Sequence, residues 1–161
     1  MSKFVLEKLS FKEQDGKEIA DFLVNHFHAD HSLDGGDSPK VHWGKTSWQI
    51  NNVLLKGIVY VVRKNKKIIG SLGLKECSHW WSDDSFLGDT WFFVRPEYRN
   101  VKGELKPSNM LLEAGIKHAE EKKMPIVMGI YNVGSIDKAE KLFLNKGFHQ
   151  IGGTYYNGLS R

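Results

Sequence analysis

The sequence contains a single cysteine, Cys77, and only four prolines among its 161 residues. One cysteine excludes an intramolecular disulfide and any zinc site built from several cysteines. The chain also lacks an uninterrupted apolar run of about eighteen residues, the length that a membrane-spanning helix needs. Its N-terminal residues carry charges inside their first apolar stretch, unlike a signal peptide. We therefore expect a soluble, cytoplasmic protein that has no membrane partner and lies in a reducing compartment.

A strong excess of charge is absent as well. Lysine and arginine number 23 against 19 aspartates and glutamates, which gives a net charge of +4. The lysines are scattered, so no specific nucleic-acid binding is predicted, and a small polyanionic ligand suits this balance equally well. The length fits one domain, residues 1–161, with a hydrophobic core of its own.

The spacing of apolar residues predicts alternating strands and helices. Strands are expected over residues 4–11, 58–63, 67–74, 86–94 and 125–131, with one or two closing strands over 148–156. Helices are expected over 17–28, 47–55, 108–123 and 135–146, with Thr46 as the N-cap of the second. The fold class is therefore α/β, with a mixed, mostly antiparallel central sheet of six to seven strands flanked by about four helices.

A basic turn separates the strand at 86–94 from the helix after Pro107. The first amides of a helix lack intrahelical acceptors, and the helix dipole is positive there, so such a turn favours an anion. Arg99, Lys102 and Lys106 add positive charge at this place. The turn is either an anion site or a plain strand-to-helix loop with solvated lysines.

Two sequence motifs resemble those of a known family. The segment Val94–Arg99, with Gly103 and the helix after it, resembles the acetyl-coenzyme A signature of the GCN5-related N-acetyltransferases. Residues 139–148, followed by Gly152, Gly153, Tyr155 and Tyr156, resemble the family's later helix, Gly-Phe and strand element. The resemblance covers essentially the whole chain. It implies a fold with splayed fourth and fifth strands, acetyl-coenzyme A as co-substrate, and acetyl transfer to an amine by direct attack in a ternary complex.

The resemblance also implies how the cofactor is held in the V between these strands. The pantetheine arm would pair with main-chain groups, the pyrophosphate would lie on the turn, and further residues would contact the rest of the molecule. The residues implied are, in that order, Phe92, Phe93 and Val94; Arg99, Lys102, Gly103, Ser108 and Asn109; Asn132 and Phe143.

The turn departs from the family pattern, because three residues separate Arg99 from Gly103 and Leu105 replaces a small residue. Ser108 and Asn109 therefore either donate side-chain hydrogen bonds to phosphate or cap the helix that follows.

Asp89, on the strand before the cofactor-pairing residues, is our candidate general base, although an aspartate there is also compatible with a solvated strand edge. Many family members carry a tyrosine where this chain has Phe143, and a phenyl ring cannot donate a proton to the leaving thiolate. Tyr131 is our candidate acid, with Tyr155 or water as alternatives. Alternatively, acetyl transfer proceeds without an acid, or the protein is a catalytically degenerate binding or assembly module.

The acceptor is expected to be a small-molecule or peptide amine, and a homodimer is compatible with the family. His26, His28, Asp30 and His31 are ligand types for iron, but a frayed helix end would point them apart, so no metal site is predicted. Asp83 and Asp84 are interpreted as a polar hairpin tip. The neighbouring Trp80 and Trp81 are assigned either to core packing or to an acceptor pocket.

Overall fold

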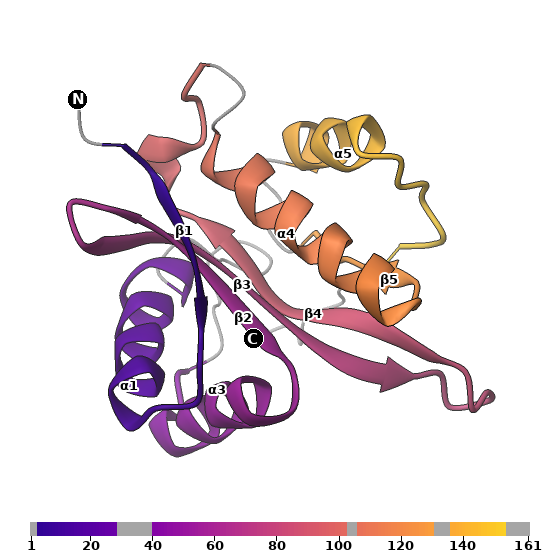
Figure 1. Cartoon of the computed structure of the whole chain (residues 1–161), viewed down its shortest axis with the longest axis horizontal. Coiled ribbons are helices and arrows are strands. Elements are labelled where there is room, and N and C mark those ends of the chain that lie inside the picture. Colours follow the sequence, from indigo (N-terminus) through magenta and orange to yellow (C-terminus); the bar gives the residue numbers. More distant parts are fainter. Residues whose placement is uncertain (1–2, 29–39, 103–105, 131–135, 154–161) are drawn as a thin grey trace, which may run out of the picture.

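The computed structural model describes residues 3–28, 40–102, 106–130 and 136–153. These residues form three layers, with α1 and α3 on one face of a central sheet and α4 on the other (Figure 1). The sheet has five strands in the order β1-β2-β3-β4-β5. The first four pair antiparallel, and β5 joins β4 in parallel. The strands are β1 (Val5–Leu9), β2 (Ile58–Lys64), β3 (Lys67–Ser78), β4 (Ser85–Val94) and β5 (Ile126–Val127).

Among the described residues, the four α-helices expected from the sequence are present in the expected order, with changes at their ends. They are α1 (Glu13–Phe22), which continues into the π-helical segment η1 (Leu23–Phe27), then α3 (Trp43–Lys56), the 3-10 turn η3 (Pro96–Tyr98), α4 (Pro107–Lys122) and α5 (Ile136–Asn145). The expectation that Thr46 caps the second helix is wrong. His42 is the N-cap, and its Nδ1 accepts a hydrogen bond from the Lys45 amide at 3.1 Å. An imidazole nitrogen thus accepts the capping hydrogen bond that a serine or aspartate oxygen usually accepts.

The hairpin between β2 and β3 turns through two residues with left-handed backbone angles. Asn65 has φ of 51° and Lys66 has φ of 67°. Such a turn matches the right-handed twist of the flanking strands, and asparagine tolerates the conformation. The hairpin that the sequence predicts at these two residues is therefore confirmed.

Alternate residues of the central strands supply two separate cores. Val59 and Val61 of β2 point toward α1 and α3, in a cluster that also contains Trp91 and Phe93 of β4. Ile58 and Val62 point the other way, toward Leu111 of α4. The period of two expected of a strand thus places a helix layer on each face of the sheet.

The expected strand count is wrong for the part of the chain that the structure describes. The sheet there has five strands, because residues 148–153 form no strand, while 154–156 lie outside the described residues. The strand expected over 125–131 is reduced to Ile126 and Val127. The described residues 128–130 have no ladder partner on β4, so this part of an apolar run that predicts a strand is irregular.

None of the described helices is long and apolar enough to cross a membrane.

Candidate functional site

A bulge in β4 sets the geometry of the site. Gly73 of β3 pairs with Trp91, whereas the next residue, Leu74, pairs with Asp89, so Thr90 is the extra residue. A bulge bends a strand and increases its twist. Leu87 and Gly88, before the bulge, pair with β5, and no pair joins the two strands after it. The strands β4 and β5 therefore diverge from Asp89 onward.

A cavity of about 670 Å³ lies at this divergence. Its walls come from β4 after the bulge, the turn that follows β4, the first turn of α4, the segment after β5, and α5. Of the residues named from the sequence, the cavity is lined by Phe92, Phe93, Val94, Arg99, Lys106, Ser108, Asn109 and Phe143. The structure thus brings together eight residues that span more than fifty positions of the sequence.

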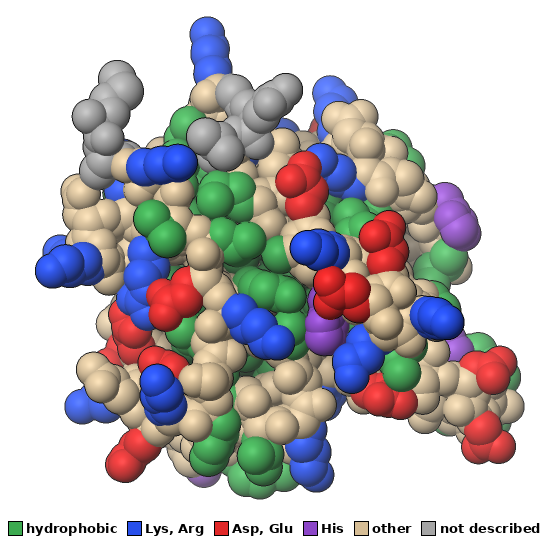
Figure 2. Space-filling model, in the orientation of Figure 1, with side chains coloured by type: hydrophobic (Ala, Val, Ile, Leu, Met, Phe, Trp, Pro, Cys, Tyr) green, Lys and Arg blue, Asp and Glu red, His purple; other side chains and the backbone are tan. Residues whose placement is uncertain are grey.

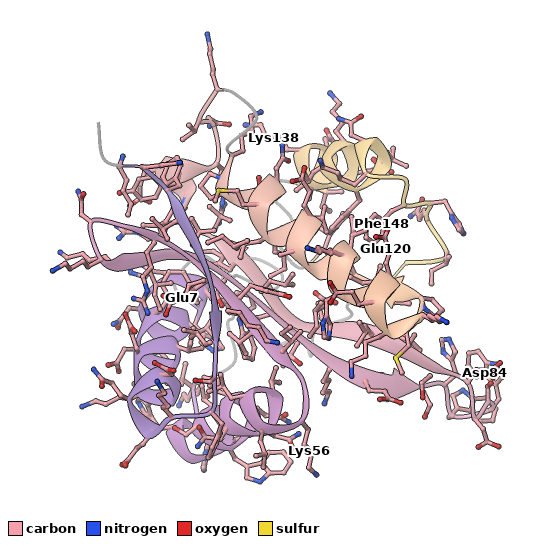
Figure 3. All side chains as sticks on the ribbon, viewed as in Figure 1. Glu7, Lys56, Asp84, Glu120, Lys138 and Phe148 are labelled. Atoms are coloured by element: carbon pink, nitrogen blue, oxygen red, sulfur yellow. The ribbon has the colours of Figure 1, made fainter. Side chains whose placement is uncertain are left out.

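Positive charge surrounds the cavity. Arg99, Lys106, Lys138, Lys141 and Lys146 line it, and its described lining includes no aspartate or glutamate. The side chain of Lys138 lies between α5 and the first turn of α4 in Figure 3. Lys146 is neutralised in part by Glu113, 2.5 Å away. A cavity with this lining favours a polyanion.

The lysines of α5 were missed from the sequence, and a signal for them exists. Lys138, Lys141 and Asn145 recur at spacings of three and four on the helix, so they share one face with Leu142. Lys102 behaves differently, because it is exposed and does not line the cavity.

The first turn of α4 faces the cavity with main-chain donors that have no acceptor within the helix. Lys106 is the N-cap and makes no side-chain cap, and Pro107 follows it at the first helical position. The next residues, Ser108 and Asn109, line the cavity, and their amides have no acceptor within the helix. Because Lys106 occupies the N-cap position, both residues lie inside the first turn of the helix. Helix dipole and amides together favour an anion at this end.

The edge of β4 that faces away from β3 also carries main-chain groups. Arg95 donates to the Ile69 carbonyl at 2.9 Å, so by the alternation of an antiparallel pair Phe93 and Trp91 bond toward β3. Main-chain groups of Phe92 and Val94 consequently point to the opposite edge. Arg99 Nε reaches the Val94 carbonyl there at 2.7 Å, and the Arg99 guanidinium lies 5.1 Å from the Phe93 ring centre. Arg99 is thus tied to the strand that it follows.

Asp89 occupies the point where the strands separate. Its Oδ1 accepts a hydrogen bond from the Gly129 amide at 3.1 Å, while Oδ2 is buried and accepts none from the described residues. Burial raises the pKa of Asp89 from 3.8 to about 6, against the opposing effect of the Gly129 amide. A carboxylate with this pKa is a competent general base near neutral pH.

Phe143 forms the wall of the cavity on α5. Its ring is buried and lies 6.1 Å from the Phe92 ring and 5.4 Å from the Phe148 ring. Phe143 is therefore held in an apolar cluster beside the edge of β4, and its ring has no hydroxyl group that could donate a proton. Several candidate residues named from the sequence lie outside the described residues. They are Gly103, Tyr131, Asn132, the alternative acid Tyr155, and Asp30 and His31.

No family model matches the sequence, and no curated protein matches it. Solved structures match the fold over nearly the whole chain. An aminoglycoside acetyltransferase from an uncultured soil metagenomic sample has a TM-score of 0.65 at 13% identity, covering 98% of this chain and 99% of that one. A predicted acetyltransferase from Clostridium acetobutylicum, solved with acetyl-CoA, has a TM-score of 0.70 at 12% identity, covering 96% of each chain.

An aminoglycoside N-acetyltransferase bound to a bisubstrate analogue, CoA-S-monomethyl-acetylneamine, has a TM-score of 0.66 at 10% identity. That match covers 99% of this chain and 100% of the other. A GCN5-related glucosamine N-acetyltransferase region of a fungal enzyme is also similar, at a TM-score of 0.62. The chain therefore has the fold of the GCN5-related N-acetyltransferases, as the two sequence motifs imply.

Proposed function

We propose that the protein is an N-acetyltransferase that moves the acetyl group of acetyl-coenzyme A to an amine acceptor by direct attack in a ternary complex. The cavity where β4 and β5 diverge carries the proposal, because five cations and a helix N-terminus surround it and its described lining includes no acid. Coenzyme A is a polyanion with an extended amide-bearing arm, and it matches both the charge and the exposed strand edge. Structures of the same fold with acetyl-CoA or a bisubstrate analogue bound support the assignment.

In this proposal each wall of the cavity has its own task. Amides of Ser108 and Asn109, with Arg99 and Lys106, hold the pyrophosphate. Main-chain groups of Phe92 and Val94 pair with the pantetheine amides as an added strand would. The Val94 carbonyl already accepts from Arg99, which leaves the amide of Val94 and the groups of Phe92 for this pairing. Gly103 and Asn132 remain proposed contacts from the sequence, whereas Lys102, which is exposed and does not line the cavity, is assigned none.

The chemistry requires a proton acceptor beside the thioester. The amine nitrogen forms a bond to the acetyl carbon, the carbon–sulfur bond breaks, and the amine loses one proton. Asp89 Oδ2 accepts this proton, because it is buried, unpaired among the described residues, and has a pKa of about 6. Tyr131 is proposed to return a proton to the thiolate, since Phe143 cannot.

The experiment is an assay of coenzyme A release. Acetyl-CoA is mixed with the protein and a panel of amines, which covers polyamines, aminoglycosides, amino acids and lysine peptides. Free thiol is measured, and the signal of a blank containing the protein without amine is subtracted, because the Cys77 thiol also reacts. We expect saturable thiol release with at least one amine and its loss in Asp89→Asn. Asp21→Asn, which changes an exposed aspartate on α1, serves as the matched control.

A second candidate function is a binding module that keeps the fold without transfer. Phe143 favours it, because this ring occupies the cavity wall without a proton to donate. Such a module would bind acetyl-CoA in a calorimeter and would release no thiol with any amine of the panel.

A further inference from the structure

The hairpin between β3 and β4 projects beyond the rest of the sheet. The last β2 pair to β3 is at Leu74, and β5 reaches only Leu87 of β4. The pairs Cys77 with Phe86 and Ser78 with Ser85 lie further out. Figure 1 shows this arm at the lower right, and Asp84 marks its end in Figure 3.

Two adjacent indole rings are exposed at the tip of the arm. Trp80 is 92% exposed and Trp81 is 65% exposed, the highest values among the described large apolar side chains apart from Ile151. Exposing such rings is unfavourable in water, and adjacent exposed aromatic rings mark interaction sites far more often than isolated ones do. The two tryptophans contribute nothing to either hydrophobic core.

The rings are nevertheless held in place. His79 stacks on Trp81 with ring centres 4.5 Å apart and a 10° interplanar angle, and His79 also contacts Phe86 at 4.8 Å. Trp80 meets Trp81 edge to face at 5.4 Å. The turn below is closed by the Ser82 amide, which donates to the His79 carbonyl at 3.2 Å. A ligand that binds these rings therefore does not need to order them first.

The charge of the tip is opposite to that of the chain. Asp83 and Asp84 follow the tryptophans and are exposed, on a protein whose net charge is +4. Acidic and apolar surfaces lie together at this end of the molecule in Figure 2. Indole faces attract guanidinium and ammonium groups, and carboxylates beside them pair with the same cations. Nucleic acids and anionic lipid surfaces carry the wrong charge for this tip.

We propose that the tip formed by Trp80, Trp81, Asp83 and Asp84 is a docking surface for a basic polypeptide segment. Arginine or lysine side chains of the segment lie against the indole rings and pair with the two carboxylates. A convex, hydrated surface gives a single cation little affinity, since an exposed ion pair is worth about 1 kcal/mol or less. Several linked cations on one extended chain add their contributions, which a small amine with a single charge cannot do.

The test measures binding directly, so it does not depend on acetyl transfer. Fluorescein-labelled hexa-arginine is titrated with the full-length protein at about 0.15 M salt, where weak long-range attraction is screened, and anisotropy is followed. We expect saturable binding that weakens at least about fivefold in Asp83→Asn/Asp84→Asn and by a similar factor in Trp80→Ala. Unchanged thermal unfolding of the variants shows that the fold is intact.

Two controls separate the tip from general attraction. Glu120→Gln/Glu121→Gln neutralises another exposed adjacent acidic pair, on α4, and Trp48→Ala removes an exposed tryptophan from α3. Both should leave the affinity within about twofold of the native value.

Three results would overturn the proposal. They are the absence of peptide binding, an equal loss in either control, and a Trp80-dependent association of the protein with itself or with phosphatidylcholine vesicles in place of the peptide.

Discussion

The Asp89 carboxylate accepts a hydrogen bond of 3.1 Å from the Gly129 amide, which links β4 to the segment after β5 at the point where the two strands separate. This bond fixes one carboxylate oxygen on the segment after β5. The other oxygen, Oδ2, is buried and accepts no hydrogen bond from the described residues. Asp89 is not among the residues that line the cavity, and Oδ2 is the proton acceptor that the proposed mechanism uses.

The pH dependence of activity should follow Asp89. The base works when deprotonated, and its pKa is raised to about 6, so kcat/KM should rise as the pH increases through about 6 and then level off. Asp89→Asn should lower kcat by about a hundredfold or more and abolish this rise. A pH–rate profile of both proteins with the best amine of the panel provides the measurement. An unchanged rise in the variant would assign the titration to another group.

The same residue should reduce stability at neutral pH. Because the folded-state pKa lies above the ordinary value of 3.8, the folded state holds the Asp89 proton more tightly, and stability declines as the pH rises from about 4 to about 6. This difference in pKa corresponds to about 3 kcal/mol of unfolding free energy once Asp89 is fully ionised. Asp89→Asn keeps an acceptor for Gly129 and should be more stable than the native chain at pH 8, with little difference below about pH 4. Urea unfolding at the two pH values tests this, and a less stable variant at pH 8 contradicts it.

Two lysines of the turn should differ in their effect on cofactor binding. Lys106 lines the cavity, whereas Lys102 is exposed and does not. Lys106→Ala should weaken acetyl-CoA binding by about three- to tenfold, and Lys102→Ala by less than about twofold. Calorimetric titration of the two variants gives the comparison. The reverse order would place the pyrophosphate at Lys102.

A buried hydrogen-bond chain behind β4 should be important for stability. Trp91 Nε1 donates to Ser71 Oγ at 2.9 Å, and Ser71 donates to the Tyr60 carbonyl at 3.0 Å. Ser71→Ala leaves the buried indole N–H without its acceptor, which should cost about 1–3 kcal/mol of unfolding free energy. Ser78→Ala, at an exposed position of the same strand, is the control. Equal denaturant midpoints for the two variants would show that the chain contributes nothing.

Sequence reasoning named the residues of β4, the turn and the start of α4 that line the cavity, because the motif that contains them is local. Phe92, Val94 and Arg99 lie within eight consecutive residues, and the helix start after Pro107 is visible in the pattern. The lysines of α5 are distant in sequence, so only the fold reveals that they face the same space.

Strand length was less predictable. The run after Pro125 is apolar enough for a full strand, yet the bulge at Thr90 turns β4 away and leaves that run without a partner. Strand pairing depends on two segments together, so the sequence of β4 or of the run after Pro125 alone does not predict that the two diverge. The error over the helix cap has a different cause. Histidine is an uncommon N-cap, so cap propensity favours Thr46 over His42.

Titration of the intact protein with acetyl-CoA in a calorimeter tests the central claim most directly. If the cavity where β4 and β5 diverge holds the cofactor, one molecule should bind per chain with a dissociation constant on the order of micromolar. Asn109→Trp, which fills the cavity beside the first turn of α4, should abolish the heat signal while the protein stays folded. No heat of binding by the intact protein at millimolar acetyl-CoA would contradict the account.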